Sequence, residues 1–257
     1  MSIYEKFGEY YDLIYQGMVN YEKECDALEK IFAKLCRRKP KSILDVGCGT
    51  GSHAVILSKR GYNVTGIDIS KTIIKKAKEK AKKEKVKAEF FVQDMRNIKL
   101  NKKFDCAICI FGGFGYILKY EDLVNAFSGL RQHLNKDCLF IFEFWNVGGI
   151  RPSPYQSWMK TQDENVTLYR LSESNFDPQT NVLNIDFHFI SIRKDKLVET
   201  FNETHKIKCY TLAEIRKYLE DNEFKLVSDY DWNGKNGTEF KTPRKETFRI
   251  LAIAKKS

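Results

Sequence analysis

Three glycines at alternate positions, Gly47, Gly49 and Gly51, follow a short apolar run and constrain the fold more than any other feature of the sequence. The apolar run at 43–46 predicts a buried strand, and the apolar residues at 54–57 predict a helix. A second apolar run ends at Asp68. This order of strand, glycine turn, helix and strand predicts one right-handed βαβ unit with parallel strands.

The spacing of glycines and acids in this unit indicates which of two kinds of nucleotide ligand the loop would bind. The dinucleotide fingerprint is G-x-G-x-x-G, whereas the run here reads G-x-G-x-G because Ser52 follows Gly51. Asp45 precedes the first glycine by two positions, and a carboxylate there would repel a pyrophosphate but attract an ammonium group. Asp68 lies nineteen residues after Gly49 and is placed to accept hydrogen bonds from both hydroxyls of a ribose.

The remaining pattern predicts an α/β domain with a doubly wound, mostly parallel sheet of seven strands and an insertion. Strand tips near 47, 68, 94, 111 and 144 carry glycine, acidic or aromatic residues, and the carboxyl ends of parallel strands meet at one ligand-binding edge. After Trp145, Pro152 and Pro154 indicate a loop. Three alternating strands are expected over 165–172, 181–193 and 196–209. Because no long helix separates them, we expect an inserted antiparallel sheet.

Composition excludes several classes of protein. Cys106 and Cys109 are spaced C-x-x-C, but inside an apolar strand, where alternation sends them to opposite faces, so we expect neither a redox pair nor a metal site. The N-terminus lacks the apolar core of a signal peptide, and no run reaches the roughly 18 uncharged residues of a membrane span. We expect a cytoplasmic protein without membrane contact, either a monomer or a homodimer.

The net charge of +10 is concentrated in one segment. Residues 71–87 contain nine lysines and two glutamates, which leaves +3 for the rest of the chain. Ile73, Ile74, Ala77 and Ala81 form an apolar stripe at helical spacing in this segment. The lysines therefore form the solvated face of a helix rather than a nucleic-acid patch.

Taken together, the motifs resemble the class I S-adenosylmethionine (SAM) methyltransferases, whose first motif reads D-x-G-x-G-x-G as residues 45–51 do. The resemblance covers 40–145 and 211–254. The stretches 11–15, 95–96, 111–116 and 143–145 are similar to the small-molecule N-methyltransferases, which include glycine N-methyltransferase and the N,N-dimethyltransferases of nucleotide-linked amino sugars. The resemblance implies three parts of the chain. These are an N-terminal helical arm over the active site (1–38), a SAM-binding domain (39–145 and 210–257) and an inserted β lid that contacts substrate (146–209).

The resemblance also assigns roles to positions in this sequence. Asp45 and the loop Gly47, Cys48, Gly49 and Gly51 would hold the methionine end of the cofactor, and Tyr11 would close over it. Asp68 would bind the ribose, Ile69 would lie against the adenine, and Asp94 and Met95 would contact the adenine edge. Phe111 and Gly112 would lie beneath the sulfonium. Tyr116 and Tyr4 would orient the acceptor. Where the amino-sugar enzymes can carry a histidine, this sequence has Tyr116, which weakens the case for a sugar substrate.

We therefore expect a SAM-dependent methyltransferase that acts on a small molecule, most favourably at nitrogen, by in-line displacement that yields S-adenosylhomocysteine without a metal. A neutral amine needs no strong base, and His53, His188 and His205 are interpreted as structural residues. One alternative is an RNA methyltransferase, with Lys75, Lys76, Lys82 and Lys83 on phosphates. Another is a SAM-binding protein without catalysis. A nicotinamide oxidoreductase is the weakest alternative, because the third glycine of its fingerprint is absent.

Overall fold

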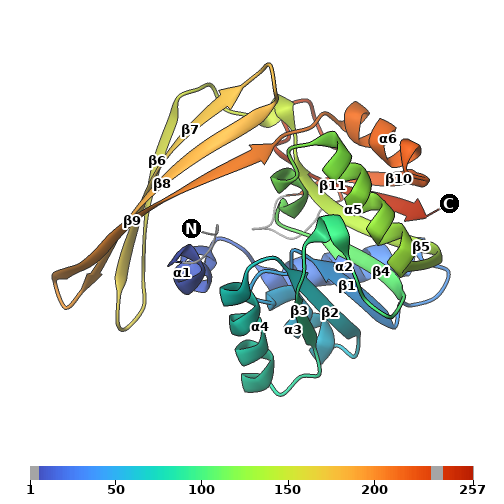
Figure 1. Cartoon of the computed structure of the whole chain (residues 1–257), viewed down its shortest axis with the longest axis horizontal. Helices are drawn as coiled ribbons and strands as arrows, with labels where there is room; N and C mark the ends of the chain where they lie inside the picture. Colours follow the sequence, from blue (N-terminus) through green and yellow to red (C-terminus); the bar gives the residue numbers. More distant parts are fainter. Residues whose placement is uncertain (1–5, 233–239, 257) are drawn as a thin grey trace.

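The computed structural model describes residues 6–232 and 240–256 (Figure 1). The helices are α1 (Lys6–Tyr15), α2 (Tyr21–Leu35), α3 (Ser52–Lys59), α4 (Lys71–Lys83), α5 (Tyr120–His133) and α6 (Leu212–Asp221), with short 3-10 turns η1 (Met95–Asn97), η2 (Gly113–Tyr116) and η3 (Val147–Gly149). The strands are β1 (Ser42–Val46), β2 (Asn63–Asp68), β3 (Glu89–Val92), β4 (Phe104–Cys109), β5 (Leu134–Trp145), β6 (Tyr155–Gln162), β7 (Thr167–Asp177), β8 (Val182–Arg193), β9 (Lys196–Lys208), β10 (Phe224–Asp231) and β11 (Arg249–Lys256). In the described segments, no helix combines the length and apolarity needed to cross a membrane.

Seven strands form one twisted sheet in the order β10-β11-β5-β4-β1-β2-β3. β11 runs antiparallel to both of its neighbours, and the other neighbouring pairs are parallel. Helices α2, α3 and α4 bury their apolar faces on one side of the sheet, while α5 and α6 cover the other side. This arrangement confirms the predicted doubly wound fold.

The alternation of β4 separates the two cysteines of the C-x-x-C pair. Cys106 belongs to the buried cluster under α2, α3 and α4, and Cys109 belongs to the cluster under α5 and α6. Both are free thiols. The prediction that alternation sends them to opposite faces of the strand is confirmed.

Local capping sets where two of the helices begin. The Ser70 hydroxyl accepts the backbone N–H of Ile73 at the start of α4, and Thr211 and Glu214 form a reciprocal capping box at the start of α6. Such caps satisfy N–H groups that lack a partner in the first helical turn. α4 buries Ile73, Ile74, Ala77 and Ala81, as its apolar stripe predicts, and most of its lysines face outward.

A second, antiparallel sheet in the order β6-β7-β8-β9 lies between β5 and α6 in the chain. The prediction of three strands is wrong in number, because residues 155–162 form a fourth strand, β6. β6 is an edge strand that mixes polar and apolar residues on both faces, with Met159 on the half-buried face and Trp158 72% exposed on the other. Its sequence therefore lacks the apolar alternation of a half-buried strand. The hairpin between β8 and β9 turns at Lys194 and Asp195, both at positive φ.

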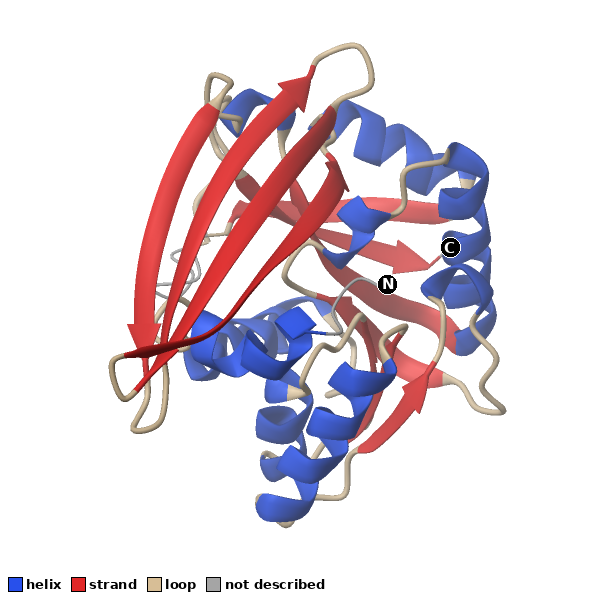
Figure 2. Cartoon of the chain, turned by 60° about the vertical axis from the view of Figure 1, so that its left-hand side comes forward, coloured by secondary structure: helices blue, strands red, loops and turns tan. Residues whose placement is uncertain are grey.

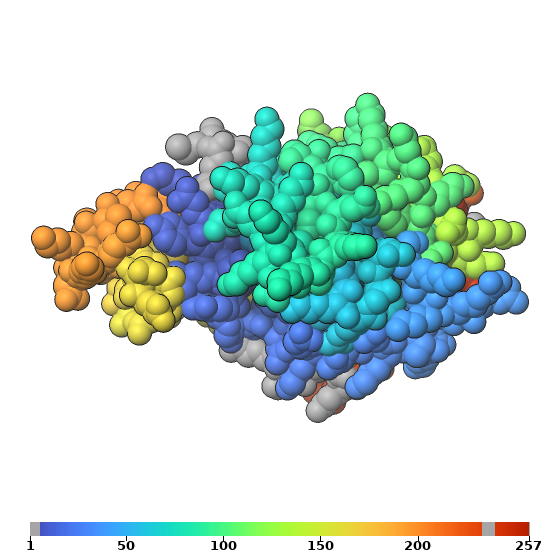
Figure 3. Space-filling view, turned by 90° about the horizontal axis from the view of Figure 1, so that it is seen from below, coloured from blue at the N-terminus to red at the C-terminus, as the bar shows by residue number. Residues whose placement is uncertain are grey.

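The inner face of this second sheet packs against α1 (Figure 2). Phe189 is fully buried there, with its ring centroid 5.5 Å from that of Phe7 and 4.6 Å from that of Phe201. Tyr10 adds a hydrogen bond of 2.9 Å to Glu199. In the view from below, the N-terminal segment lies between the ends of the second sheet and the helices of the first sheet (Figure 3). α1 therefore connects the two sheets.

We expect Phe189→Ala to lower the free energy of unfolding by about 3–5 kcal/mol, because it leaves a cavity between α1 and the second sheet. Urea unfolding measures this change. The neighbouring His188→Ala is the matched control, since His188 is exposed on the opposite face of the same strand and should change stability by less than about 0.5 kcal/mol. Equal effects of the two substitutions would contradict the packing described here.

Candidate active site

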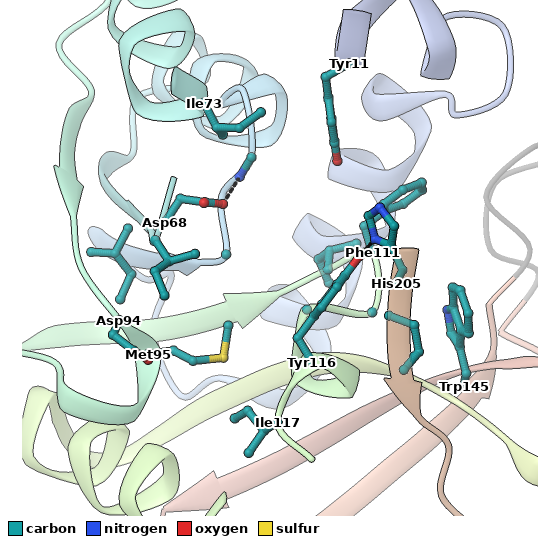
Figure 4. A pocket seen from close by; sticks show the side chains of 18 of the residues that line it. Tyr11, Asp68, Ile73, Asp94, Met95, Phe111, Tyr116, Ile117, Trp145 and His205 are labelled. Carbon is teal, nitrogen blue, oxygen red and sulfur yellow. Dashed lines mark hydrogen bonds between the residues drawn. The ribbon is translucent and has the colours of Figure 1, made fainter. Parts of the chain in front are cut away.

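A cavity of about 320 Å³ lies where the carboxyl ends of the central strands face α1 and the second sheet (Figure 4). The loop after β1 and the ends of β2, β4 and β5 form one side of it, while residues of α1, β8 and β9 form the other. Polar groups in its wall include Asp68, Asp94, Tyr116 and His205. The cavity therefore joins the predicted ligand edge of the parallel sheet to the inserted sheet.

The glycine loop is tied to the end of β2 by the Asp68 carboxylate. Its Oδ2 accepts the Gly49 N–H at 3.1 Å, and its Oδ1 accepts the Ser70 N–H at 2.9 Å. Burial raises the pKa of Asp68, while these backbone hydrogen bonds oppose the rise. Gly49 adopts φ +55°, and a Cβ there would lie 3.4 Å from Tyr11 Oη. A side chain at Gly49 would thus narrow the cavity under α1.

Asp94 and Met95 follow β3 at another edge of the cavity. Arg96 Nε lies 2.9 Å from each Asp94 oxygen, and the Arg96 side chain holds the pKa of Asp94 below its usual range. The Asp94 carboxylate therefore stays ionised at neutral pH and remains a hydrogen-bond acceptor. Ile69 lines the same side and is 59% exposed, so its apolar side chain faces the cavity rather than the core.

Asp45 lies at a smaller neighbouring cavity, together with Cys48, Tyr21 and His53. Its side chain is buried, and its Oδ2 has no hydrogen-bond partner within 6–232 and 240–256. Burial is the main cause that raises the pKa of Asp45 to about 6. A buried carboxylate without a partner is unfavourable, and a cationic ligand group beside it would relieve that cost.

Most of the predicted site residues lie around these two cavities. The larger cavity is lined by Tyr11, Gly47, Gly49, Asp68, Ile69, Asp94, Met95, Phe111, Gly112 and Tyr116, and the smaller one by Asp45 and Cys48. Gly51 lines neither cavity. It has φ +77°, and a Cβ there would lie 2.8 Å from the Phe90 ring of β3. Gly51 therefore serves the close packing of this turn against the sheet. Tyr4 lies outside the described residues.

Phe111 is held in an unusual backbone conformation at the floor of the cavity. Its φ is +73°, which is strained for an aromatic residue, and its N–H donates to Glu143 Oε2 at 2.9 Å. Arg249 donates to both oxygens of Glu143, at 2.7 and 2.6 Å, and its guanidinium lies 5.4 Å from the Phe111 ring centroid. Burial alone would lower the pKa of Arg249, but Glu143 and Glu24 raise it.

The buried carboxylate of Glu24 also pairs with His53, and Glu24 Oε2 lies 2.8 Å from His53 Nε2. Burial lowers the pKa of His53, but Glu24, Asp45 and Glu143 together outweigh that effect and the net shift is upward. His53 therefore has a buried acidic partner, in agreement with its interpretation as a packing residue. Glu24, Glu143 and Arg249 were not predicted as parts of the site, because they come from distant segments that meet only in the folded chain.

Sequence reasoning also missed the contact between Tyr116 and His205. Tyr116 Oη lies 2.6 Å from His205 Nδ1, and both residues line the large cavity (Figure 4). His205 is 3% exposed, although it belongs to the strand β9 of the inserted sheet. The alternation of β9 could have placed His205 on the inner face. Because His205 lies 89 residues from Tyr116 in the sequence, no local pattern indicates that the two side chains meet.

Comparisons with known proteins agree with this geometry. Residues 43–137 match the model of a methyltransferase domain family. The dTDP-3-amino-3,4,6-trideoxy-α-D-glucopyranose N,N-dimethyltransferase of Streptomyces venezuelae is 28% identical over 210 residues, 80% of this chain and 85% of that protein. A SAM-dependent methyltransferase from Clostridium acetobutylicum has the same fold, with a TM-score of 0.82, 24% identity and 99% of each chain covered. A SAM-bound amino pentose methyltransferase from Micromonospora echinaspora follows at a TM-score of 0.77 and 19% identity, with 96% of each chain covered.

The fold, the cavity and these likenesses define a SAM-dependent methyltransferase of class I. This chain is similar to that class over residues 43–137, and within it the chain resembles the small-molecule N-methyltransferases. Its residues also fit the cofactor chemically. Asp45 Oδ2 is a buried acceptor suited to an ammonium group, and the Asp68 carboxylate retains lone pairs beyond its two backbone hydrogen bonds.

The raised pKa of Asp45 predicts a pH-dependent stability difference for Asp45→Asn. The pKa is 3.8 in the reference state and about 6 in the folded protein, so only the folded protein takes up a proton between these values. The ionised carboxylate thus opposes folding above pH 6, and this penalty disappears as the pH falls toward 4. Without ligand, we expect the variant to be more stable by about 2–3 kcal/mol at pH 7, and by much less at pH 4. Urea unfolding across this range measures the difference, and parallel profiles would contradict it.

Proposed function

We propose that this protein transfers a methyl group from SAM to a nitrogen atom of a small-molecule acceptor. The observation that carries the proposal is the single cavity in which Asp68 and the glycine loop line one end, and Tyr116, Trp145 and His205 line the other. The relatives whose names specify an acceptor include two that methylate the amino group of dTDP-linked sugars. Their chemistry supports nitrogen as the acceptor atom here.

In this proposal the cofactor occupies the end of the cavity formed by the parallel sheet. Asp45 binds the ammonium of its methionine part, and Asp68 accepts the ribose hydroxyls. Ile69, Asp94 and Met95 surround the adenine. Phe111 and Gly112 lie beneath the sulfonium, and Tyr11 covers the methionine end from α1. These assignments are supported by the lining of the two cavities and by the buried, partly unsatisfied Asp45 carboxylate.

The acceptor occupies the other end, against the inserted sheet. Ile185, Phe187 and Ile207 make this wall mostly apolar, and Tyr116 Oη is a polar group that can orient an amine. Tyr4, which lies outside the described residues, is the second orienting residue that we propose. The bound cofactor supplies a methyl group already activated by a positively charged sulfur. The remaining task of the chain is to hold the nitrogen in line and exclude water, which requires no metal.

The segments of the chain divide this work. We propose that residues 1–38 act as an arm over the site and 146–209 as a lid that contacts the acceptor, while 39–145 and 210–257 bind the cofactor. Hydrogen bonds and ring packing between α1 and the second sheet support the arm and the lid acting as one cover. We also propose a cytoplasmic location, which the free state of all seven cysteines supports.

We expect Asp68→Ala to weaken SAM binding at least tenfold while the fold is retained, because the ribose loses its acceptor and the glycine loop loses its tie to β2. Isothermal calorimetry measures the affinity, and circular dichroism checks the fold. Asp105→Ala is a matched control, since Asp105 also accepts two backbone N–H groups, those of Lys41 and Ser42, but before β1 at the far end of the sheet. Unchanged SAM affinity in the Asp68 variant would reject the cofactor assignment.

A second candidate function, methylation of RNA, would use the lysines of α4. Lys76 Nζ donates to the Glu9 carbonyl at 2.8 Å, and Lys80 Nζ contacts Asp12, Thr50 and Ser52. Lys76 therefore ties α4 to α1, and Lys80 ties α4 and α1 to the end of the glycine loop, which gives both lysines a structural use. Lys75 and Lys82 are exposed and remain available to phosphates.

A labelling experiment distinguishes the two functions. The protein is incubated with methyl-labelled SAM and a cell extract, and the label is then measured in the small-molecule and RNA fractions. We expect label in the small-molecule fraction, and the charge-reversed variant Lys75→Glu/Lys82→Glu should label that fraction at the wild-type rate. Label in RNA that the double variant fails to produce would establish the RNA function instead. SAM binding with no labelled product would favour a protein that binds SAM without catalysis.

A further inference from the structure

His205 occupies an unusual place for a histidine in an inserted sheet. It lies on the inner face of β9, opposite Ile185 of β8, and its ring is packed among the rings of Phe7, Tyr116 and Phe187. The centroid distances to these three rings are 5.5, 5.8 and 5.1 Å. The imidazole is thus fixed in orientation at the acceptor end of the cavity.

The two ring nitrogens of His205 face chemically different neighbours. Nε2 lies 3.4 Å from Glu203 Oε1, and Nδ1 lies 2.6 Å from Tyr116 Oη. The 3.4 Å separation of Nε2 from Glu203 is a charge contact rather than a hydrogen bond. A carboxylate beside Nε2 electrostatically favours the neutral tautomer that keeps its hydrogen on Nε2. Nδ1 then carries the lone pair, and the Tyr116 hydroxyl donates to it. This order, a carboxylate behind an imidazole behind a hydroxyl, is the arrangement that activates nucleophilic hydroxyl groups in hydrolases.

The other ionisable groups around this pair are few within 6–232 and 240–256. Tyr11 and Tyr15 of α1 line the same cavity, and the Arg170 guanidinium of β7 lies 5.0 Å from the Phe187 ring centroid, beside the ring that touches His205. Burial raises the pKa of Tyr15 to about 12, while Arg170 lowers it and Glu203 raises it. Glu203 is thus the one carboxylate among these neighbours that could stabilise a charge on the His205 ring.

We propose that Tyr116, His205 and Glu203 form a proton relay that deprotonates the acceptor, so that the enzyme uses amines that are charged ammonium ions in solution. This inference rests on the proposed function. The N–H bond of the ammonium breaks as its proton bonds to Tyr116 Oη. The tyrosine's own proton passes to His205 Nδ1, and the imidazolium is stabilised by Glu203. The freed nitrogen lone pair then bonds to the methyl carbon of the cofactor, and the sulfur retains the electron pair of the broken S–C bond. The imidazolium releases its proton to solvent, which completes the balance.

This relay names the acceptor class more narrowly than the proposed function does. An aliphatic amine with a pKa of about 10, like that of lysine, is neutral in only about one molecule in a thousand at pH 7. A site without a base would use only that fraction, whereas the relay can use the rest. We therefore expect a primary or secondary aliphatic amine as the acceptor. In this scheme Tyr116 contacts the substrate, and His205 and Glu203 are positioning residues that act through it.

The tautomer of His205 tests the relay without any acceptor. The chain has four histidines, so [15N]histidine labelling of the full-length protein gives a spectrum that can be assigned with single His→Gln variants. We expect the hydrogen of the neutral His205 ring to lie on Nε2, and Tyr116→Phe to shift the Nδ1 signal while the His188 signals stay unchanged. A hydrogen on Nδ1 would overturn the proposal, because that nitrogen could not then accept a proton from Tyr116.

The pH profile of methyl transfer provides the second test, with methyl-labelled SAM and the two dTDP-3-amino sugars named in the relatives as probes. We expect His205→Gln to lower kcat/KM at pH 7 by about 100-fold or more. The loss should shrink toward pH 10, where the amine is already neutral, and the SAM affinity should be unchanged. Glu203→Gln should give a smaller loss with the same pH trend. The control is His188→Gln, on the outer face of the same sheet, which should retain wild-type activity at every pH.

The outcomes separate the relay from the proposed function. An equal loss at all pH values in His205→Gln would show that the histidine only supports the fold, and it would reject the relay while leaving N-methylation intact. Methylation of oxygen or carbon alone would reject the proposed acceptor atom. If neither sugar is methylated, the tautomer of His205 decides the relay by itself.

Discussion

The parallel pairing of β1 with β2 and β4 is the constraint on which the site depends. Val46 lies opposite Ile67, and Asp45 lies opposite Ile108, so three strands end at nearly the same level. The hydrogen bond from Gly49 N–H to Asp68 then fixes the loop after β1 against the end of β2. Because these hydrogen bonds tie the loop to the sheet, they place its backbone, the acids and the aromatic floor around one cavity.

Charge compensation keeps the floor of that cavity in place. Glu143 is fully buried, yet it is paired with Arg249 and accepts the strained Phe111 N–H, so its burial is balanced. Glu24 extends this network to His53. Asp45 stands apart from it, with a buried Oδ2 that no described residue satisfies. The charges beneath the cavity floor therefore compensate one another. At Asp45 a buried negative charge lacks a partner in the described part of the chain, and a cationic ligand group would compensate it.

The second sheet adds the other half of the cavity through simple strand alternation. On β8 and β9, every second residue faces α1 and the cavity, including Phe189 and His205, while His188 faces outward. The hairpin at Lys194 and Asp195 and the irregularity between Ser191 and Ile192 together set the pairing register, and a shift by one residue would exchange the two faces. Since this wall of the cavity comes from a separate sheet, its side chains can vary without disturbing the loop that follows β1.

The sequence by itself determined the features that arise from local pattern and backbone conformation. The βαβ unit, the Ser70 cap, the Thr211 capping box and the opposite faces of Cys106 and Cys109 follow from periodicity and nearest neighbours, which are readable in one chain. Strand β6 escaped prediction because an exposed edge strand carries little apolar alternation. The Tyr116–His205 contact and the Glu143–Arg249 pair join residues 89 and 106 positions apart. Only the tertiary structure decided these contacts, because the partner of a buried polar group is set by how the sheets and α1 pack rather than by any local signal.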